Sequence, residues 1–323
     1  MRLLTLLGYL MALTLTGNAG VGPHAAPVVN ENLATQIALD RIGFSPGEID
    51  GHAGRNLQRA VAAFQHSHQL PATGQMNDET WKQLAPTGEV PPLVEYVTTD
   101  TDVAGPFTPI IPAKLPDQAG LDSLSYRSPL EGLAERFHSS PALLQQLNPE
   151  ATFRRAGEDL MVPNVIASSA STATPGATGT AGSVRGGDIT VVVTKSTSAL
   201  TIEDPSGRVL FHAPVTSGST HDPLPIGTWK VNGVQRNPTF HYNPELFWDA
   251  TPGDRKATLQ PGPNNPVGVV WIDLSKPHYG IHGTPEPSQI GHVESHGCVR
   301  LTNWDADRVA QWVKPGTKVV FRQ

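Results

Sequence analysis

The sequence predicts a multidomain protein in which a small helical unit and a mixed α+β unit precede a mostly-β C-terminal domain. At 323 residues the chain is too long for one small domain. Its apolar residues follow helical spacing in the N-terminal half and form β-branched runs after residue 188. Between these halves, residues 166–187 are mostly small or polar and include Gly and Pro, so they cannot bury enough apolar surface to fold. We expect a flexible linker there.

The charge balance excludes one class of partner. The formal net charge is -6 and the pI is near 6.0, which leaves no basic surface for nucleic acid. The 30 Pro and 31 Gly, set against only 16% charged residues, favour turns, linkers and short strands.

Residues 1–19 are typical of an export signal. Arg2 supplies a short positive region, residues 3–15 are apolar, and Gly17-Asn18-Ala19 offers small residues for cleavage. The apolar stretch is short for a membrane span, although an uncleaved anchor is the alternative. We expect an exported protein of the periplasm or cell wall that meets the membrane only through this signal.

Residues 31–86 are expected to form a unit of three helices. Asn77 is a candidate N-cap for the last of them, and glycines punctuate the turns. The apolar residues at helical spacing are Leu33, Ile37, Leu57, Val61, Phe64, Trp81 and Leu84.

Residues 94–165 suggest a strand–helix–helix–strand unit. Residues 160–163 are a candidate closing strand, and apolar residues at helical spacing lie at 130–137 and 143–147. The likeness of this part to the second half of a LysM module implies that residues 94–98 form the first strand. A long Pro-containing insertion separates the first strand from the first helix. A simple spacer is the alternative for this region.

Residues 188–323 are expected to be mostly β with one late helix. The helix covers 304–313, with Asn303 as N-cap and Pro315-Gly316 as its stop. Residues 237–265 show little periodicity, and an irregular stretch of that length is usually a lid or a binding wall. The candidate strands are 189–194, 200–203, 209–212, 228–231, 269–273 and 318–321.

The only cysteine of the chain, Cys298, lies in this last domain. A lone thiol in an exported protein is an oxidation liability, so it is either an inert buried residue or a nucleophile. A nucleophilic thiol needs a base within hydrogen-bond reach and a group that orients the base. His282 is the candidate base if its strand lies beside the turn that carries Cys298, and the carbonyl of Gly283 is a candidate orienting group.

Two motifs in this region carry a family resemblance. Ile281-His282-Gly283-Thr284 followed by Ser295-His296-Gly297-Cys298-Val299-Arg300 resembles the signature of YkuD-type L,D-transpeptidases. The resemblance covers 188–323 and implies a β-sandwich with one late helix. It also implies that Cys298 is the nucleophile, that His282 is its base and that the Gly283 carbonyl orients the base. The residues implied to shape the oxyanion turn are Ser295, His296 and Gly297.

The two N-terminal units have resemblances of their own. The order of residues from Ile49-Asp50-Gly51 to Leu84 resembles that of the three-helix peptidoglycan-binding domain of wall enzymes. Residues 94–165 resemble a degenerate LysM module, which implies that this unit contacts glycan.

The resemblance implies a two-step reaction on wall stem peptides. Cys298 would attack the carbonyl of the third residue and release D-alanine, and the thioester would pass to an amine acceptor or to water. The acceptor is a second stem peptide, an outer-membrane lipoprotein or a free D-amino acid. Transfer to water would make the enzyme an L,D-carboxypeptidase. The likeness calls for no metal or organic cofactor and implies acylation by carbapenems.

Four further residues are candidates for substrate binding. Arg300 is suited to a substrate carboxylate, with a structural ion pair as the alternative. Tyr279, Trp271 and Tyr242 are candidates to line the cleft, with core packing as the alternative for Trp271.

Other reaction classes fit the sequence less well. The pairs His278/His282 and His292/His296 have an i, i+4 spacing that can bind zinc on a helix, but they lie among Gly and Pro. A papain-like wall peptidase would place its cysteine before its histidine. A non-enzymatic wall-binding protein would have lost Cys298 or His282.

Overall fold

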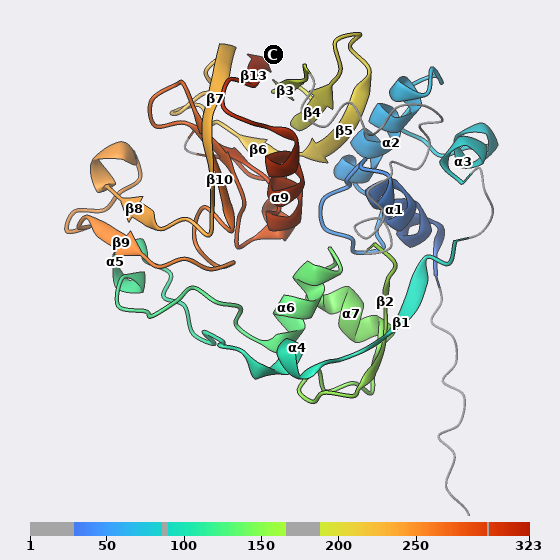
Figure 1. The fold of residues 1–323 in the computed structure, drawn as a ribbon, viewed down its shortest axis with the longest axis horizontal. Coiled ribbons are helices and arrows are strands. Elements are labelled where there is room, and N and C mark those ends of the chain that lie inside the picture. Colours follow the sequence, from blue (N-terminus) through green and yellow to red (C-terminus); the bar gives the residue numbers. More distant parts are fainter. Residues whose placement is uncertain (1–28, 86–89, 166–187, 296) are drawn as a thin grey trace, which may run out of the picture.

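The computed structural model describes residues 29–85, 90–165, 188–295 and 297–323 (Figure 1). The predicted export signal, the predicted linker 166–187 and His296 lie outside these ranges. No helix within them is both long enough and apolar enough to cross a membrane.

The N-terminal unit is helical, as the apolar spacing predicts. It consists of α1 (Glu31–Arg41), α2 (Arg55–Ser67) and α3 (Asp78–Leu84). Asn77 caps α3 by accepting a hydrogen bond from the Thr80 N–H, which confirms the predicted cap. The buried apolar residues that hold the unit together are Leu39, Phe44, Leu57, Ala60, Val61, Phe64 and Leu84.

The middle unit has the predicted strand–helix–helix–strand order. Strand β1 (Leu93–Val97) pairs antiparallel with β2 (Asp159–Pro163), and α6 (Pro129–Arg136) and α7 (Pro141–Leu147) lie between them in the chain. The core of this unit also includes Leu33, Ile37 and Ile49 of the helical unit. The helical unit thus has a core of its own and also contributes to the core of the middle unit.

The insertion of the middle unit is not a loose spacer. It carries α4 (Asp100–Ala104) and α5 (Leu115–Gln118). Leu124 packs with Tyr242 and Leu259, which belong to a hairpin of β8 (Phe240–Tyr242) and β9 (Ala257–Leu259) in the C-terminal domain. The irregular stretch predicted as a lid or wall thus forms a small hairpin, and the middle unit holds it in place (Figure 1).

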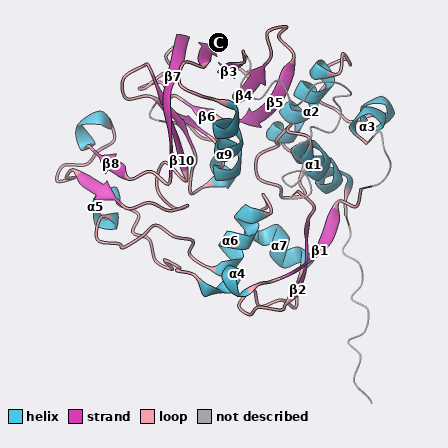
Figure 2. Cartoon of the chain, viewed as in Figure 1, coloured by secondary structure: helices cyan, strands magenta, loops and turns pink. Residues whose placement is uncertain are grey.

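The C-terminal domain is mostly β with one late helix, as predicted (Figure 2). Apart from the β8–β9 hairpin, the nine strands of its described residues form one sheet in the order β5-β4-β3-β13-β7-β10-β11-β12-β6. The strands are β3 (Thr190–Thr194), β4 (Ala199–Glu203), β5 (Val209–Pro214), β6 (Thr216–Ser217), β7 (Gly227–Arg236), β10 (Val270–Leu274), β11 (Gly280–His282), β12 (Val299–Arg300) and β13 (Lys318–Arg322).

The predicted β-sandwich is replaced by a single, nearly closed sheet. Strand β7 is ten residues long, and its first part pairs with β13 while its second part pairs with β10. This strand joins what would otherwise be two separate sheets. The outermost strands, β5 and β6, are separated by Val215 alone, so the sheet curls back toward itself.

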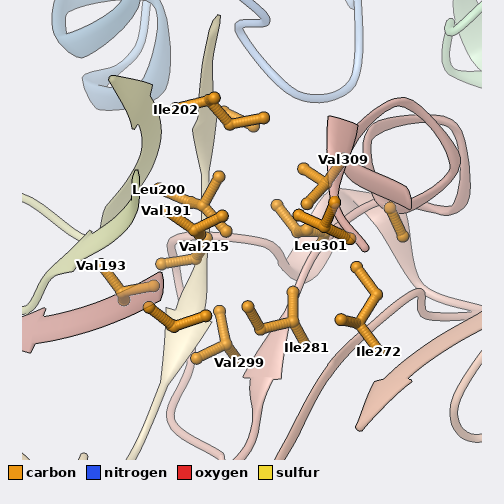
Figure 3. Close-up of a cluster of buried hydrophobic side chains, with 14 of the residues drawn as sticks. Val191, Val193, Leu200, Ile202, Val215, Ile272, Ile281, Val299, Leu301 and Val309 are labelled. Atoms are coloured by element: carbon orange, nitrogen blue, oxygen red, sulfur yellow. The ribbon is translucent and has the colours of Figure 1, made fainter. Parts of the chain in front are cut away.

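Helix α9 (Asn303–Trp312) packs against the inside of this sheet. Its Val309 and the preceding Leu301 face Ile272, Ile281 and the β-branched residues of β3 (Figure 3). The N-cap is Thr302, whose hydroxyl accepts a hydrogen bond from the Asp305 N–H, and the prediction of Asn303 as the cap is wrong. Asn303 begins the helix, and its side chain is used in tertiary contacts instead.

Candidate active site

His282 ends β11, and Cys298 immediately precedes β12, the strand that pairs parallel with β11. The register pairs Ile281 with Val299 and His282 with Arg300, so Cys298 lies beside Gly280. Because side chains alternate between the faces of a sheet, His282 and Arg300 share one face, and extending both strands back by two residues places Gly280 and Cys298 on the same face. Strand spacing and rise place the Cα atoms of Cys298 and His282 about 8 Å apart, within reach of their side chains.

The His282 imidazole is buried and fixed in one orientation. Only 4% of His282 is exposed, and its Nδ1 lies 2.7 Å from the carbonyl oxygen of Gly283. A carbonyl can only accept, so Nδ1 carries the proton and donates it, and Nε2 keeps its lone pair. Burial, with the nearby Arg300 charge, lowers the pKa of His282 to about 3. The imidazole is therefore a neutral base at physiological pH.

The thiol of Cys298 is also neutral at rest. Burial raises the pKa of Cys298, while a backbone hydrogen bond from Gly280 and the positive charge of Arg300 lower it less. The Sγ atom lies 3.7 Å from the carbonyl oxygen of His278, to which the thiol donates. Cys298 as a whole residue is half-buried.

The turn before Cys298 is fixed by Ser295. Its hydroxyl donates to the Cys298 carbonyl at 2.7 Å and accepts from the Gly218 N–H at 2.7 Å. Gly297 has a φ of +98°, and a side chain there would overlap the ring of Tyr279. This positive-φ turn is the kind that brings successive amides toward one point. His296, the remaining predicted member of the turn, lies outside the described residues.

The structure brings together three of the four predicted substrate-binding residues. Arg300 shares the face of Cys298, and within the described ranges no carboxylate lies at ion-pair distance from its guanidinium. Trp271 stacks on the His282 ring with centroids 5.4 Å apart. Tyr279 covers Gly297. Tyr242 is instead buried among Leu124 and other apolar residues beneath the hairpin, so its assignment to the cleft is corrected.

Two residues beside the site were not predicted from the sequence. Gly280 leaves space that the Trp271 ring fills, since any side chain there would overlap the indole. Gly280 lies two residues before His282, and residues two apart in a strand share one face. Strand periodicity could therefore have indicated that Gly280 lies beside the site. Asn303 packs against Gly283, but this contact joins distant segments and leaves no local pattern.

The pair His278/His282 considered for zinc is not presented on a helix, and His296 of the second pair lies outside the described residues. His278 has a φ of +67° in the turn before β11, and His282 lies in that strand. Among the residues with described positions, no group of three or more His, Cys, Asp or Glu side chains could hold a metal ion.

Comparison with known proteins gives two family matches. Residues 188–321 match the family described as "L,D-transpeptidase catalytic domain", and residues 32–84 match "Putative peptidoglycan binding domain". "Putative L,D-transpeptidase YqjB" of Bacillus subtilis is 30% identical over 141 residues, which cover 42% of this chain and 72% of that protein.

Other relatives are matched over shorter stretches. "Putative L,D-transpeptidase YkuD" of Bacillus licheniformis is 52% identical over 60 residues, covering 19% of this chain and 36% of that protein. The protein of the same name in Bacillus subtilis is 31% identical over 118 residues, covering 36% and 57%. The chain thus spans less than two thirds of these two relatives. A solved L,D-transpeptidase from Mycobacterium smegmatis is 18% identical with a TM-score of 0.34, covering 42% of this chain and 59% of that one. From the family match and the YqjB alignment, the chain belongs to the L,D-transpeptidase family of enzymes.

Proposed function

We propose that this protein is a peptidoglycan L,D-transpeptidase that uses Cys298 as its nucleophile. The observation that supports the proposal is the parallel pairing of β11 with β12, in which His282 is paired with Arg300 and Cys298 comes directly before β12. The hydrogen bond from His282 Nδ1 to Gly283 leaves Nε2 as the only nitrogen able to accept the thiol proton.

In the first step, Cys298 Sγ adds to the carbonyl of the third stem residue as its proton passes to His282 Nε2. We expect the oxyanion to form beside the turn at Gly297, whose positive φ suits a turn that directs backbone amides to one point; one such donor is worth about 3 kcal/mol in acyl transfer. The imidazolium then returns the proton to the departing nitrogen, the C–N bond breaks, and D-alanine leaves. A thioester on Cys298 remains.

In the second step, an acceptor amine attacks the thioester and loses its proton to His282 Nε2. The C–S bond breaks, a new peptide bond forms, and the proton restores the thiol. Water in place of the amine would give the L,D-carboxypeptidase reaction. The acceptor classes are a second stem peptide, an outer-membrane lipoprotein and a free D-amino acid.

Arg300 supports an anionic substrate. Burial lowers the pKa of Arg300, while the carboxylates of Glu286 and Asp249 favour its charged form. A guanidinium without an ion-pair partner among the described residues can bind a stem-peptide carboxylate bidentately. The ring of Tyr279 covers Gly297 in the turn before Cys298.

The N-terminal units suit attachment to the wall. The family match to residues 32–84 supports peptidoglycan binding by the helical unit. The strand–helix–helix–strand order of the middle unit agrees with a LysM-like, glycan-binding role. Such a protein would work outside the cytoplasm, in the periplasm or cell wall, after export by residues 1–19.

The proposal is tested by mass spectrometry after incubation with a carbapenem. The wild type should gain one covalent adduct, and Cys298→Ala should gain none because the chain has no other thiol. His282→Ala should slow the adduct strongly, whereas His292→Ala, which changes an exposed histidine of the same loop, should not. An adduct on folded Cys298→Ala would contradict the nucleophile assignment.

The reaction itself is tested with defined muropeptides. Tetrapeptide donors should lose D-alanine and yield cross-linked dimers with a mass that Cys298→Ala does not produce. Release of D-alanine without dimers, when amine acceptors are abundant, would favour the carboxypeptidase.

A further inference from the structure

We propose that Glu135 of the middle unit is a positioning residue for His282 and acts through Asn303. This inference rests on the proposed function of His282 as the base. It assigns the middle unit a part in the chemistry, in addition to any contact with the wall.

The first link is the contact between Glu135 and Asn303. Glu135 lies on α6, and its Oε1 and Oε2 atoms accept from Asn303 Nδ2 at 3.1 and 3.0 Å. The Tyr126 hydroxyl also donates to Oε1, at 3.0 Å. Asn303 is 1% exposed and makes this contact across 168 residues of sequence. The carboxylate therefore fixes the amide of a residue in another unit.

The second link is the contact between Asn303 and Gly283. Asn303 is also held by Pro263 O, which accepts from Nδ2 at 3.1 Å, and by the Val269 N–H, which donates to Oδ1 at 3.2 Å. Its Oδ1 lies so close to Gly283 and Gly268 that a side chain at either glycine would overlap it. The Asn303 side chain thus sets the position of the Gly283 backbone.

The third link is the hydrogen bond from His282 to Gly283. The Gly283 carbonyl accepts the Nδ1 proton at 2.7 Å, which decides both the tautomer and the direction of Nε2. A shift of the Gly283 peptide would turn the imidazole away from Cys298. Displacements of about 1 Å in a catalytic group can cost a hundredfold in rate.

The environment of Glu135 agrees with this role. Burial, with the nearby charge of Glu131, raises the pKa of Glu135 to about 7, although the hydrogen bonds from Asn303 and Tyr126 lower it. Both the charged and the neutral carboxyl keep an oxygen that can accept from Asn303. The acceptor, rather than the charge, is what the position requires.

The test compares saturation kinetics of carbapenem acylation in four variants. Glu135→Ala removes the acceptor and should lower the maximal acylation rate by about tenfold or more, with the half-saturating concentration unchanged. Glu135→Gln keeps an acceptor oxygen and should acylate at nearly the wild-type rate. Glu135→Asp is too short to reach Asn303 and should resemble Glu135→Ala, which decides the question if Glu135→Ala does not fold.

Glu131→Ala is the matched control. Glu131 lies one turn earlier on the same helix and contacts Asn264 of the C-terminal domain but not Asn303. Its variant should keep the wild-type maximal rate. Equal losses in Glu131→Ala and Glu135→Ala, or wild-type rates in Glu135→Ala and Glu135→Asp, would overturn the inference. A wild-type protein that forms no adduct would contradict the proposed function instead.

Discussion

At the residue scale, the site holds a neutral thiol beside a neutral imidazole. Burial raises the pKa of Cys298 and lowers that of His282. Each pKa unit by which Cys298 lies above His282 disfavours the thiolate–imidazolium pair by about 1.4 kcal/mol. The ion pair is therefore not formed before substrate arrives. Proton transfer to His282 accompanies attack on the carbonyl, and the sulfur stays in its less oxidisable form until then.

This protonation state predicts an unusual pH profile for acylation. The reactive imidazole is the neutral one, and it persists above the His282 pKa of about 3. The acylation rate constant should therefore not fall as the pH drops from 7 to 5. Arg300→Gln should move the acid limb to higher pH, because the Arg300 charge contributes to the lowered pKa. Carbapenem acylation measured from pH 4 to 8 checks this, and a half-loss near pH 6.5 in the wild type would refute it.

At the scale of elements, the sequence predicts strands better than their arrangement. The predicted strand 318–321 is found as Lys318–Arg322, and 189–194 as Thr190–Thr194, because β-branched runs are a local signal. The two-residue strands β6 and β12 carry no such signal, since their pairing depends on segments far apart. The single sheet follows from the length of β7, of which only four residues were predicted.

The candidate site shows the same division between features that have a local sequence signal and features that depend on contacts between distant segments. Cys298, His282 and Gly283 could be predicted as site residues because their types and spacing are chemically specific. The error at Asn303 arose because Thr302 and Asn303 are both good N-caps, and contacts with Glu135 and Pro263 decide between them. Tyr242 was misplaced because an aromatic residue in an irregular stretch suits a cleft and a core equally well. Only the packing of Tyr242 with Leu124 distinguishes the core position from a cleft position.

Helix α9 carries a buried acid whose effect on stability depends on pH. Asp305 is 0% exposed; burial, with the Asp40 charge, raises its pKa to about 7, against opposing effects of Arg308, Ser45 and Thr302. The folded state thus binds a proton that the unfolded state releases above pH 4, and this contribution to stability is lost as the pH rises to 7.

Asp305→Asn removes that titration. The free energy of unfolding of the wild type relative to Asp305→Asn should therefore fall by about 2 kcal/mol between pH 5 and pH 7.5. Urea unfolding of both proteins at the two pH values measures this difference. A relative stability that rises with pH would show that Asp305 is ionised in the folded protein at pH 5.

At the scale of the whole molecule, the three units meet around one buried carboxylate. Asp40 of the helical unit accepts from Arg308 of α9 at 2.9 and 3.1 Å, and His138 of the middle unit lies 3.0 Å away. The helical unit also reaches the loop between β11 and β12, where Asn56 Nδ2 donates to the Ile290 carbonyl at 2.8 Å. A unit matched to wall binding is thereby held against the segment that joins His282 to Cys298.

Asp40→Ala should loosen this junction. The Arg308 charge holds the pKa of Asp40 well below its usual range, so the carboxylate is ionised, and its removal leaves a mostly buried guanidinium without its main partner. Breaking such a pair costs about 3–5 kcal/mol, and we expect the lower end because Asp305 Oδ1 lies 3.8 Å from Arg308.

Hydrogen exchange at single amides shows where the Asp40→Ala variant loses stability. The Ser45 N–H donates to the His212 carbonyl at 2.9 Å across the boundary between the helical unit and β5, so its protection reports docking. Asp40→Ala should expose this amide and lower the free energy of unfolding. Asp78→Ala changes an exposed acid on α3 of the same unit and should do neither. If the Ser45 amide keeps its wild-type protection in Asp40→Ala, the ion pair is not needed to hold the helical unit in place. The packing of Leu33, Ile37 and Ile49 in the core of the middle unit would then be sufficient.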